Sequence, residues 1–72
     1  MPELRGRFEL KPGRPLTVPD IMSRLGSLML VDGASAPDID WTTDIVTVQV
    51  RSEQYIDRVR EAMTLAGIIV EN

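Results

Sequence analysis

In the middle of the chain the apolar residues switch from odd-numbered to even-numbered positions. This change of phase limits the possible folds more than any other feature of the sequence. Ile39 and Trp41 stand at odd positions between acids, whereas the valines within 46–50 stand at even positions. Successive side chains of a strand point to opposite faces, so one straight strand would place Trp41 and Val46 on opposite faces. A hairpin that turns at 42–44 lets both side chains point inward. The segment therefore predicts two strands joined by a tight turn.

The N-terminal segment predicts another strand. Residues 4–10 alternate apolar or small side chains with charged ones, which is the period of a half-buried strand. Residues 11–15 contain two prolines and a glycine, and this composition predicts a loop. The side chains expected to face inward are Leu4, Gly6, Phe8 and Leu10.

The first amphipathic helix is expected to begin near position 18. Thr17 precedes Pro19 and Asp20, which places a capping threonine before an acid in the first turn. Gly26 weakens this helix by about 1 kcal/mol relative to alanine, and it marks either close packing or an early end. The apolar stripe of this helix consists of Ile21, Met22, Leu25, Leu28 and Met29.

A second helix is expected after Ser52, which can cap it. Gly67 stands where the end of a helix favours a residue with positive φ. Residues 32–37 predict a loop by their composition, and the β-branched residues at 68–70 predict a last short strand. The apolar stripe of the second helix consists of Tyr55, Ile56, Val59, Ala62, Met63 and Ala66.

The elements follow in the order strand, helix, strand, strand, helix, strand. This order predicts one ferredoxin-like α+β domain over residues 1–72, with both helices on one face of a four-stranded antiparallel sheet. Right-handed crossovers place the first and third strands in the centre. On this interpretation Trp41 and the methionines at 22, 29 and 63 lie mostly in the core. An exposed Trp41 would instead be an interface anchor.

The face of the sheet opposite the helices is expected to carry charges of both signs. Arginine is favoured in protein interfaces, while acids on the same face repel phosphates. This surface therefore suits another protein or a second copy of the chain better than a bare polyanion. Nucleic acid binding stays a minor alternative, because RNA-recognition domains share the strand order but stack bases on aromatic side chains of the first and third strands. The residues expected to bind protein are Arg5, Arg7, Arg51, Asp38 and Asp40.

Composition limits the chemistry of the chain. Its 72 residues include no cysteine and no histidine, and the net charge is −3. Disulfides, thiolate chemistry, zinc fingers and imidazole catalysis are therefore excluded. The acidic residues are expected to be exposed to solvent and not in a sheltered site. We therefore expect no enzymatic activity, no catalytic residue and no cofactor. The four aspartates within 32–44 do not have the spacing of a calcium-binding loop, so we expect no metal site.

Size and hydropathy indicate a small soluble protein that needs a partner. No apolar run approaches the roughly 18 residues of a membrane span, and we expect a cytoplasmic location without membrane binding. The chain starts with methionine, which fits a complete small protein or an excised domain. Burial of apolar surface contributes on the order of 105 kcal/mol to folding. Ordering the chain costs about 108 kcal/mol, so little stability is left and association is favoured.

Two segments resemble ACT-type regulatory domains. Pro12-Gly13 follows the first strand and precedes a helix, and residues 60–70 read Arg-Glu-Ala-Met-Thr-Leu-Ala-Gly-Ile-Ile-Val. In that family a glycine of the first loop approaches an amino-acid effector, and two domains pair through sheets or helices. The resemblance implies a homodimer with a ligand near Pro12, Gly13 and Arg14, although Gly13 could also simply turn the chain. Our main hypothesis from the sequence is a non-enzymatic regulator or adaptor that binds another protein, and the alternative is an ACT-like sensor of amino acids.

Overall fold

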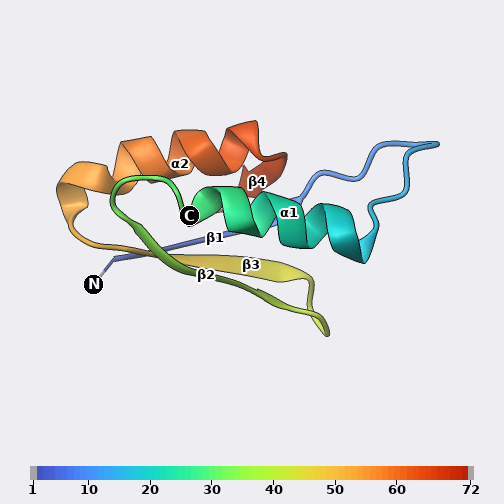
Figure 1. Ribbon diagram of the computed structural model, residues 1–72, viewed down its shortest axis with the longest axis horizontal. Helices are drawn as coiled ribbons and strands as arrows, with labels where there is room; N and C mark the ends of the chain where they lie inside the picture. The colour runs from blue at the N-terminus through green and yellow to red at the C-terminus, as the bar shows by residue number, and fades with distance from the viewer. Residues whose placement is uncertain (1, 72) are drawn as a thin grey trace.

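The computed structural model describes residues 2–71 and has the predicted order of elements (Figure 1). The four strands form one antiparallel sheet in the order β2-β3-β1-β4, and two helices cover one of its faces. This arrangement is a ferredoxin-like α+β fold, as predicted. The elements are β1 (Glu3–Phe8), α1 (Val18–Leu28), β2 (Ala34–Asp40), β3 (Ile45–Val50), the 3-10 helix η1 (Glu53–Tyr55), α2 (Ile56–Leu65) and β4 (Ile68–Val70).

The predicted hairpin is confirmed, and the pairing of its two strands explains why the apolar residues switch from odd to even positions. Ile39 of β2 lies opposite Val46 of β3, so both side chains point to the helical face and are buried. The turn between the strands contains Asp44 in the left-handed region, with φ 61°. Two antiparallel strands thus keep apolar residues of odd and even number on one side of the sheet.

β2 is longer than predicted, because part of the expected loop at 32–37 belongs to it. The strand begins at Ala34, and its pairing with β3 shifts register between Ser35 and Asp38. Ala36 has a φ of 47° at this irregularity, and Pro37 follows it. Proline occurs in sheets on edge strands and at bulges, and β2 is an edge strand with a bulge. The residue types that suit a bulge are also those of loops, so composition alone predicted a loop here.

β1 is shorter than predicted, and Leu10 does not face the core. The strand ends at Phe8, and the backbone N–H of Glu9 donates to the carbonyl of Gly67 at 2.8 Å. The chain then leaves the sheet, and Leu10 is 79% exposed. Leu4 and Gly6 are buried and Phe8 is partly buried, as the alternation of β1 predicts.

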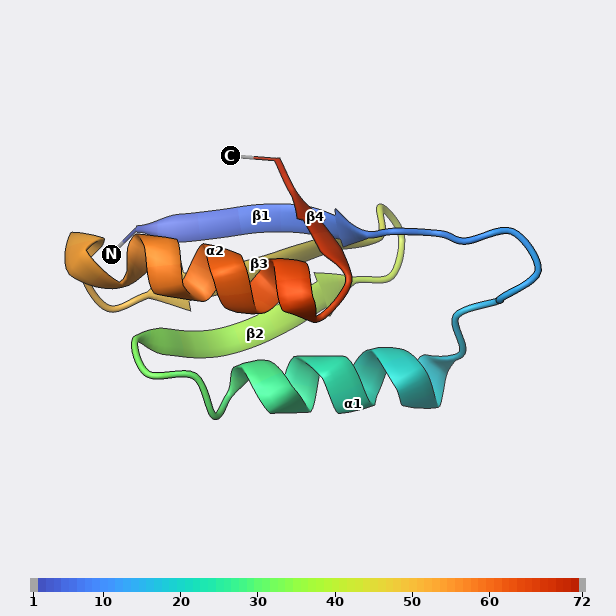
Figure 2. The same ribbon diagram turned by 90° about the horizontal axis from the view of Figure 1, so that it is seen from above.

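The core lies between the sheet and the two helices. Figure 2 shows α2 above the central strands, whereas α1 lies alongside the edge strand β2. Val59 and Met63 of α2 are fully buried, and α1 contributes Leu25 and Leu28. The inward residues of β3 are the three fully buried valines Val46, Val48 and Val50.

Three side chains predicted to be mostly in the core are exposed. Met63 is fully buried as predicted, but Met22, Met29 and Trp41 are 54%, 68% and 52% exposed. The position of α1 explains the two methionines, because a helix beside the edge strand has less of the sheet against which to bury its apolar stripe than a helix over the central strands. Trp41 is exposed because β2 ends at the preceding residue, so the alternation of the strand does not extend to it.

The helix caps follow the sequence at α1 but not at α2. The Thr17 hydroxyl accepts the Asp20 backbone N–H at 3.3 Å, and the Asp20 carboxylate accepts the Thr17 N–H at 3.3 Å. Hydrogen bonding by the Thr17 side chain and backbone lowers the pKa of Asp20. Ser52 makes no side-chain capping bond, because the chain first forms the η1 turn. Gly67 ends α2 with a φ of 84°, as predicted.

Candidate functional site

An apolar groove lies between α1 and the edge strand β2. It encloses about 220 Å³, with α1 forming one wall and the second half of β2 forming the other. Only one of its lining side chains is charged, and three large apolar ones are half exposed or more. We name it the α1–β2 groove; its lining residues are Met22, Leu25, Gly26, Met29, Pro37, Asp38, Ile39 and Trp41.

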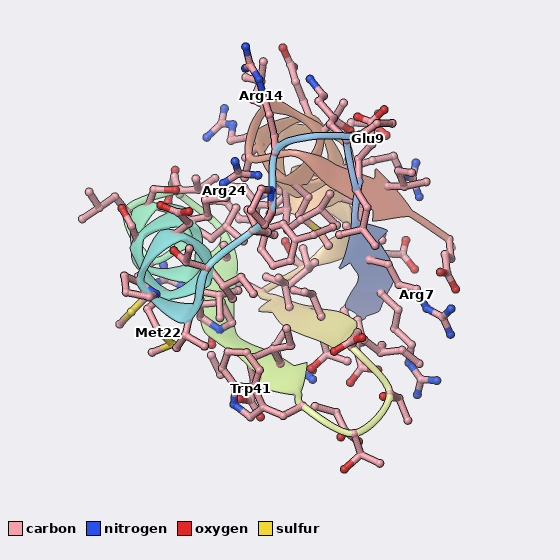
Figure 3. The ribbon with its side chains drawn as sticks, turned by 90° about the vertical axis from the view of Figure 1, so that its right-hand side faces the viewer. Arg7, Glu9, Arg14, Met22, Arg24 and Trp41 are labelled. Carbon is pink, nitrogen blue, oxygen red and sulfur yellow. The ribbon has the colours of Figure 1, made fainter. Side chains whose placement is uncertain are left out.

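The wall formed by α1 follows from helical spacing. Met22, Gly26 and Met29 are four and three residues apart, so they lie on one side of the helix. A Cβ atom built on Gly26 would meet nothing within 4 Å, so the groove is open between the two methionines. Figure 3 shows Met22 and Trp41 on the same flank of the molecule. The groove is therefore accessible to a partner from solvent.

Trp41 contributes to the other wall because it is the first residue of the turn that follows β2. The Asp40 carboxylate accepts the Thr42 backbone N–H at 2.8 Å, and the Asp40 carbonyl accepts the Asp44 N–H at 2.7 Å. These bonds hold residues 41–44 in a turn instead of a strand. The sequence prediction of a core Trp41 was wrong for this reason, and the alternative of an exposed tryptophan beside the edge strand is what the structure shows.

The sheet face opposite the helices brings together part of the predicted protein-binding set. Arg5 of β1 and Asp38 of β2 both lie opposite Thr47 of the central strand β3. Arg5, Asp38 and Asp40 line a shallow hollow of about 370 Å³. Arg51 does not line it, because β3 ends at the residue before it.

Two arginines of this face are paired with neighbouring acids. The Arg5 Nε donates to the Glu3 carboxylate at 2.8 Å, and the Gln49 side-chain amide donates to it at 2.6 Å. These two hydrogen bonds lower the pKa of Glu3, and the bond from Arg5 has the larger effect. Arg7 lies 3.3 Å from the Glu71 carboxylate. The outward positions of β1 and β3 present no aromatic ring to stack a base, so we do not propose nucleic acid binding.

The residues predicted to bind a small ligand are only partly brought together. A cleft of about 460 Å³ lies between the loop after β1 and the ends of the helices, and Lys11, Arg14 and Arg24 line it together with Glu9. Pro12 and Gly13 do not line the cleft.

Gly13 and Arg24 have structural roles beside the cleft. Gly13 has a φ of 75° in a turn closed by the Arg14 N–H, which donates to the Lys11 carbonyl at 3.1 Å. Arg24 donates to the Ala66 carbonyl at 3.2 Å and stacks over Phe8 at 5.7 Å from the ring centroid. Figure 3 shows Arg24 on the side of α1 that faces α2, away from Trp41.

Comparison of the chain with protein-family models, with curated proteins and with solved structures gave no match. Within residues 2–71, no three acids gather where they could hold a metal ion. None of the helices in the described part of the chain is long and apolar enough to cross a membrane.

Proposed function

We propose that this protein is a non-enzymatic regulator or adaptor that binds another protein through the α1–β2 groove. The observation that carries the proposal is the exposure of Met22, Met29 and Trp41 around one hollow. Grouped apolar side chains on the surface of a small protein mark interaction sites, and tryptophan and methionine are enriched in interfaces. Asp38 lines both this groove and the hollow of the sheet face, so a partner bound in the groove would also reach the predicted charged surface.

The non-enzymatic part of the proposal is supported by the placement of the ionisable groups. Every charged side chain within residues 2–71 is exposed or half-buried. Catalytic acids and bases are typically shielded from water, where burial and neighbouring charges shift their pKa toward neutrality. The pKa shifts of Glu3 and Asp20 are in the opposite direction, since both carboxyl groups are held in the charged form by hydrogen bonds.

Photocrosslinking in the native host tests the proposal. A photoreactive amino acid at position 29, in the groove, is expected to crosslink one or a few defined proteins. The matched control carries the same amino acid at position 61, an exposed site of α2 outside the groove. Adding Met22→Ser to the position-29 variant should remove most of the crosslinked product, because the substitution makes the groove polar. Identical products from positions 29 and 61, or none from position 29, would contradict the proposal.

A second candidate function is an ACT-like sensor of amino acids, and the charged cleft favours it. Lys11, Arg14 and Arg24 are suited to a carboxylate, while Glu9 is suited to an ammonium group. If this function is correct, an amino acid from a metabolite panel will raise Tm in proportion to the logarithm of its concentration. Arg14→Gln should abolish the shift with little change in the Tm of the free protein, because Arg14 is exposed. A flat response across the panel would leave protein binding as the better explanation.

A further inference from the structure

We infer that the partner of the α1–β2 groove is an amphipathic helix whose apolar stripe is flanked by lysine or arginine. The inference rests on the proposed function and adds the chemistry of the partner. It follows from three properties of the groove: an interrupted strand edge, a gap between two methionines, and an aspartate as its one charged lining residue.

The interrupted strand edge excludes an extended partner. Strand addition needs a continuous row of backbone N–H and C=O groups on the edge strand. β2 has its register shift between Ser35 and Asp38, with the left-handed Ala36 inside it. Pro37 has no N–H to donate. An added strand would therefore lose its ladder in the middle of β2, next to the groove.

The gap on α1 fits the side chains of another helix. Met22 and Met29 are seven residues apart, which is about 10 Å along the helix axis. Gly26 between them has no side chain, and the space where a Cβ would stand is open. Packed helices fit the side-chain ridge of one into the groove of the other, and small residues let the axes come closer. Methionine side chains adapt their shape to such a partner, and Trp41 offers a large flat contact on the opposite wall.

The charge of the groove favours a basic partner over a second copy of the chain. Asp38 is the one charged residue among those that line the groove, and no ion pair to it occurs within residues 2–71. The hairpin from 34 to 45 contains three aspartates and no basic residue. Arg24 of α1 is held away on the other side of the helix by the Ala66 carbonyl. Two copies meeting through this groove would bring like charges together, which is unfavourable.

Two synthetic peptides without tryptophan test the inference on the intact protein. Both are 18-residue helices with the same leucine stripe, flanked by lysine in one and by glutamate in the other. Trp41 is the single tryptophan of the chain, so its emission reports directly on the groove. We expect the lysine peptide to shift this emission to the blue in a saturable manner and to gain helical circular dichroism on binding. The glutamate peptide should bind at least tenfold more weakly.

Substitutions assign the binding to the groove. Asp38→Asn should weaken the lysine peptide by about fivefold, as for an exposed charge pair. Glu61→Gln on α2 makes the same change in net charge outside the groove and should have no effect. Gly26→Gln should weaken binding tenfold or more by filling the gap, and unchanged far-ultraviolet circular dichroism would show that the variant is folded.

Several outcomes would overturn the inference. They are the absence of an emission shift with the lysine peptide, equal affinity for both peptides, a bound peptide without helix, or equal effects of Asp38→Asn and Glu61→Gln. Concentration-dependent self-association that Gly26→Gln abolishes would assign the groove to a second copy instead. If the peptides fail while position 29 still crosslinks a defined host protein, the partner chemistry is wrong but the proposed function stands. Failure of both experiments would overturn both.

Discussion

Met63→Ala is expected to lower the free energy of unfolding by roughly 3 kcal/mol, whereas Met29→Ala changes it by less than about 0.5 kcal/mol. Met63 is fully buried between α2 and the sheet, so its truncation leaves a cavity and removes apolar contacts. Met29 is 68% exposed, and its side chain has little contact to lose. Such a loss at Met63 is most of the stability of a domain of this size.

Urea denaturation followed by far-ultraviolet circular dichroism measures both differences. Met63 and Met22 both lie inside helices, so helix propensity changes about equally in Met63→Ala and Met22→Ala, whereas Met29 is the C-cap residue of α1. Met22→Ala is a second control on α1 and should behave like Met29→Ala, since Met22 is 54% exposed. Equal destabilisation by all three substitutions would show that α1 packs as deeply as α2, and the α1–β2 groove would then not exist as described.

The methionines also show where sequence reasoning was sufficient and where it was not. Helical periodicity correctly identifies which residues share one side of each helix. It does not reveal how much of the sheet that side covers, because this depends on where the helix lies across the strands. α2 lies over the central strands and buries its stripe, but α1 lies at the edge and leaves Met22 and Met29 exposed. A stripe of five apolar residues on a short edge helix is the signal that could have revealed the groove.

The hairpin and the bulge of β2 form a similar contrast. The phase change at 42–44 predicts the hairpin correctly, because alternation is a local property that sheet pairing preserves. The bulge at Ala36 and Pro37 was missed, because its residue types are those of a loop and only the pairing with β3 makes them part of a strand. The position of Trp41 depends on the end of β2, which the side chain and carbonyl of Asp40 fix through the turn.

The predicted charged face of the sheet is only partly confirmed, because alternation along a strand is predictable and the end of a strand is not. The sequence correctly places Arg5, Asp38 and Asp40 near one another, because it predicts both the strand order and which residues of each strand point away from the helices. Arg51 does not line this hollow because it lies one residue beyond the end of β3, and strand ends are the least predictable feature of a sequence. The pairing of Arg5 with Glu3 involves residues of one strand whose side chains share a face, and it depends on side-chain conformation that spacing does not determine.

Gly6→Ala is expected to destabilise the protein by about 2–3 kcal/mol, because β1 and β4 leave no room for a side chain at this position. A Cβ atom on Gly6 would collide with the Ile69 backbone carbonyl and would lie 2.6 Å from the Ile68 Cγ2. A backbone carbonyl in a sheet cannot move aside without loss of pairing, and Gly6 lies directly opposite Val70. The substitution should therefore separate β4 from the sheet and expose apolar surface at that edge.

Gly26→Ala is the matched control and should have the opposite sign. Gly26 lies in the interior of α1 with open space at its Cβ position, so alanine should raise the free energy of unfolding by about 1 kcal/mol through helix propensity alone. Urea denaturation of both variants, with hydrogen exchange of the β4 amides, measures the contrast. A Gly6→Ala variant as stable as the parent, with β4 still protected, would show that β4 does not pack closely against β1. Gly26 thus makes the free protein less stable than alanine would at this position. This cost is understandable if the absence of a side chain is needed for the approach of a partner helix.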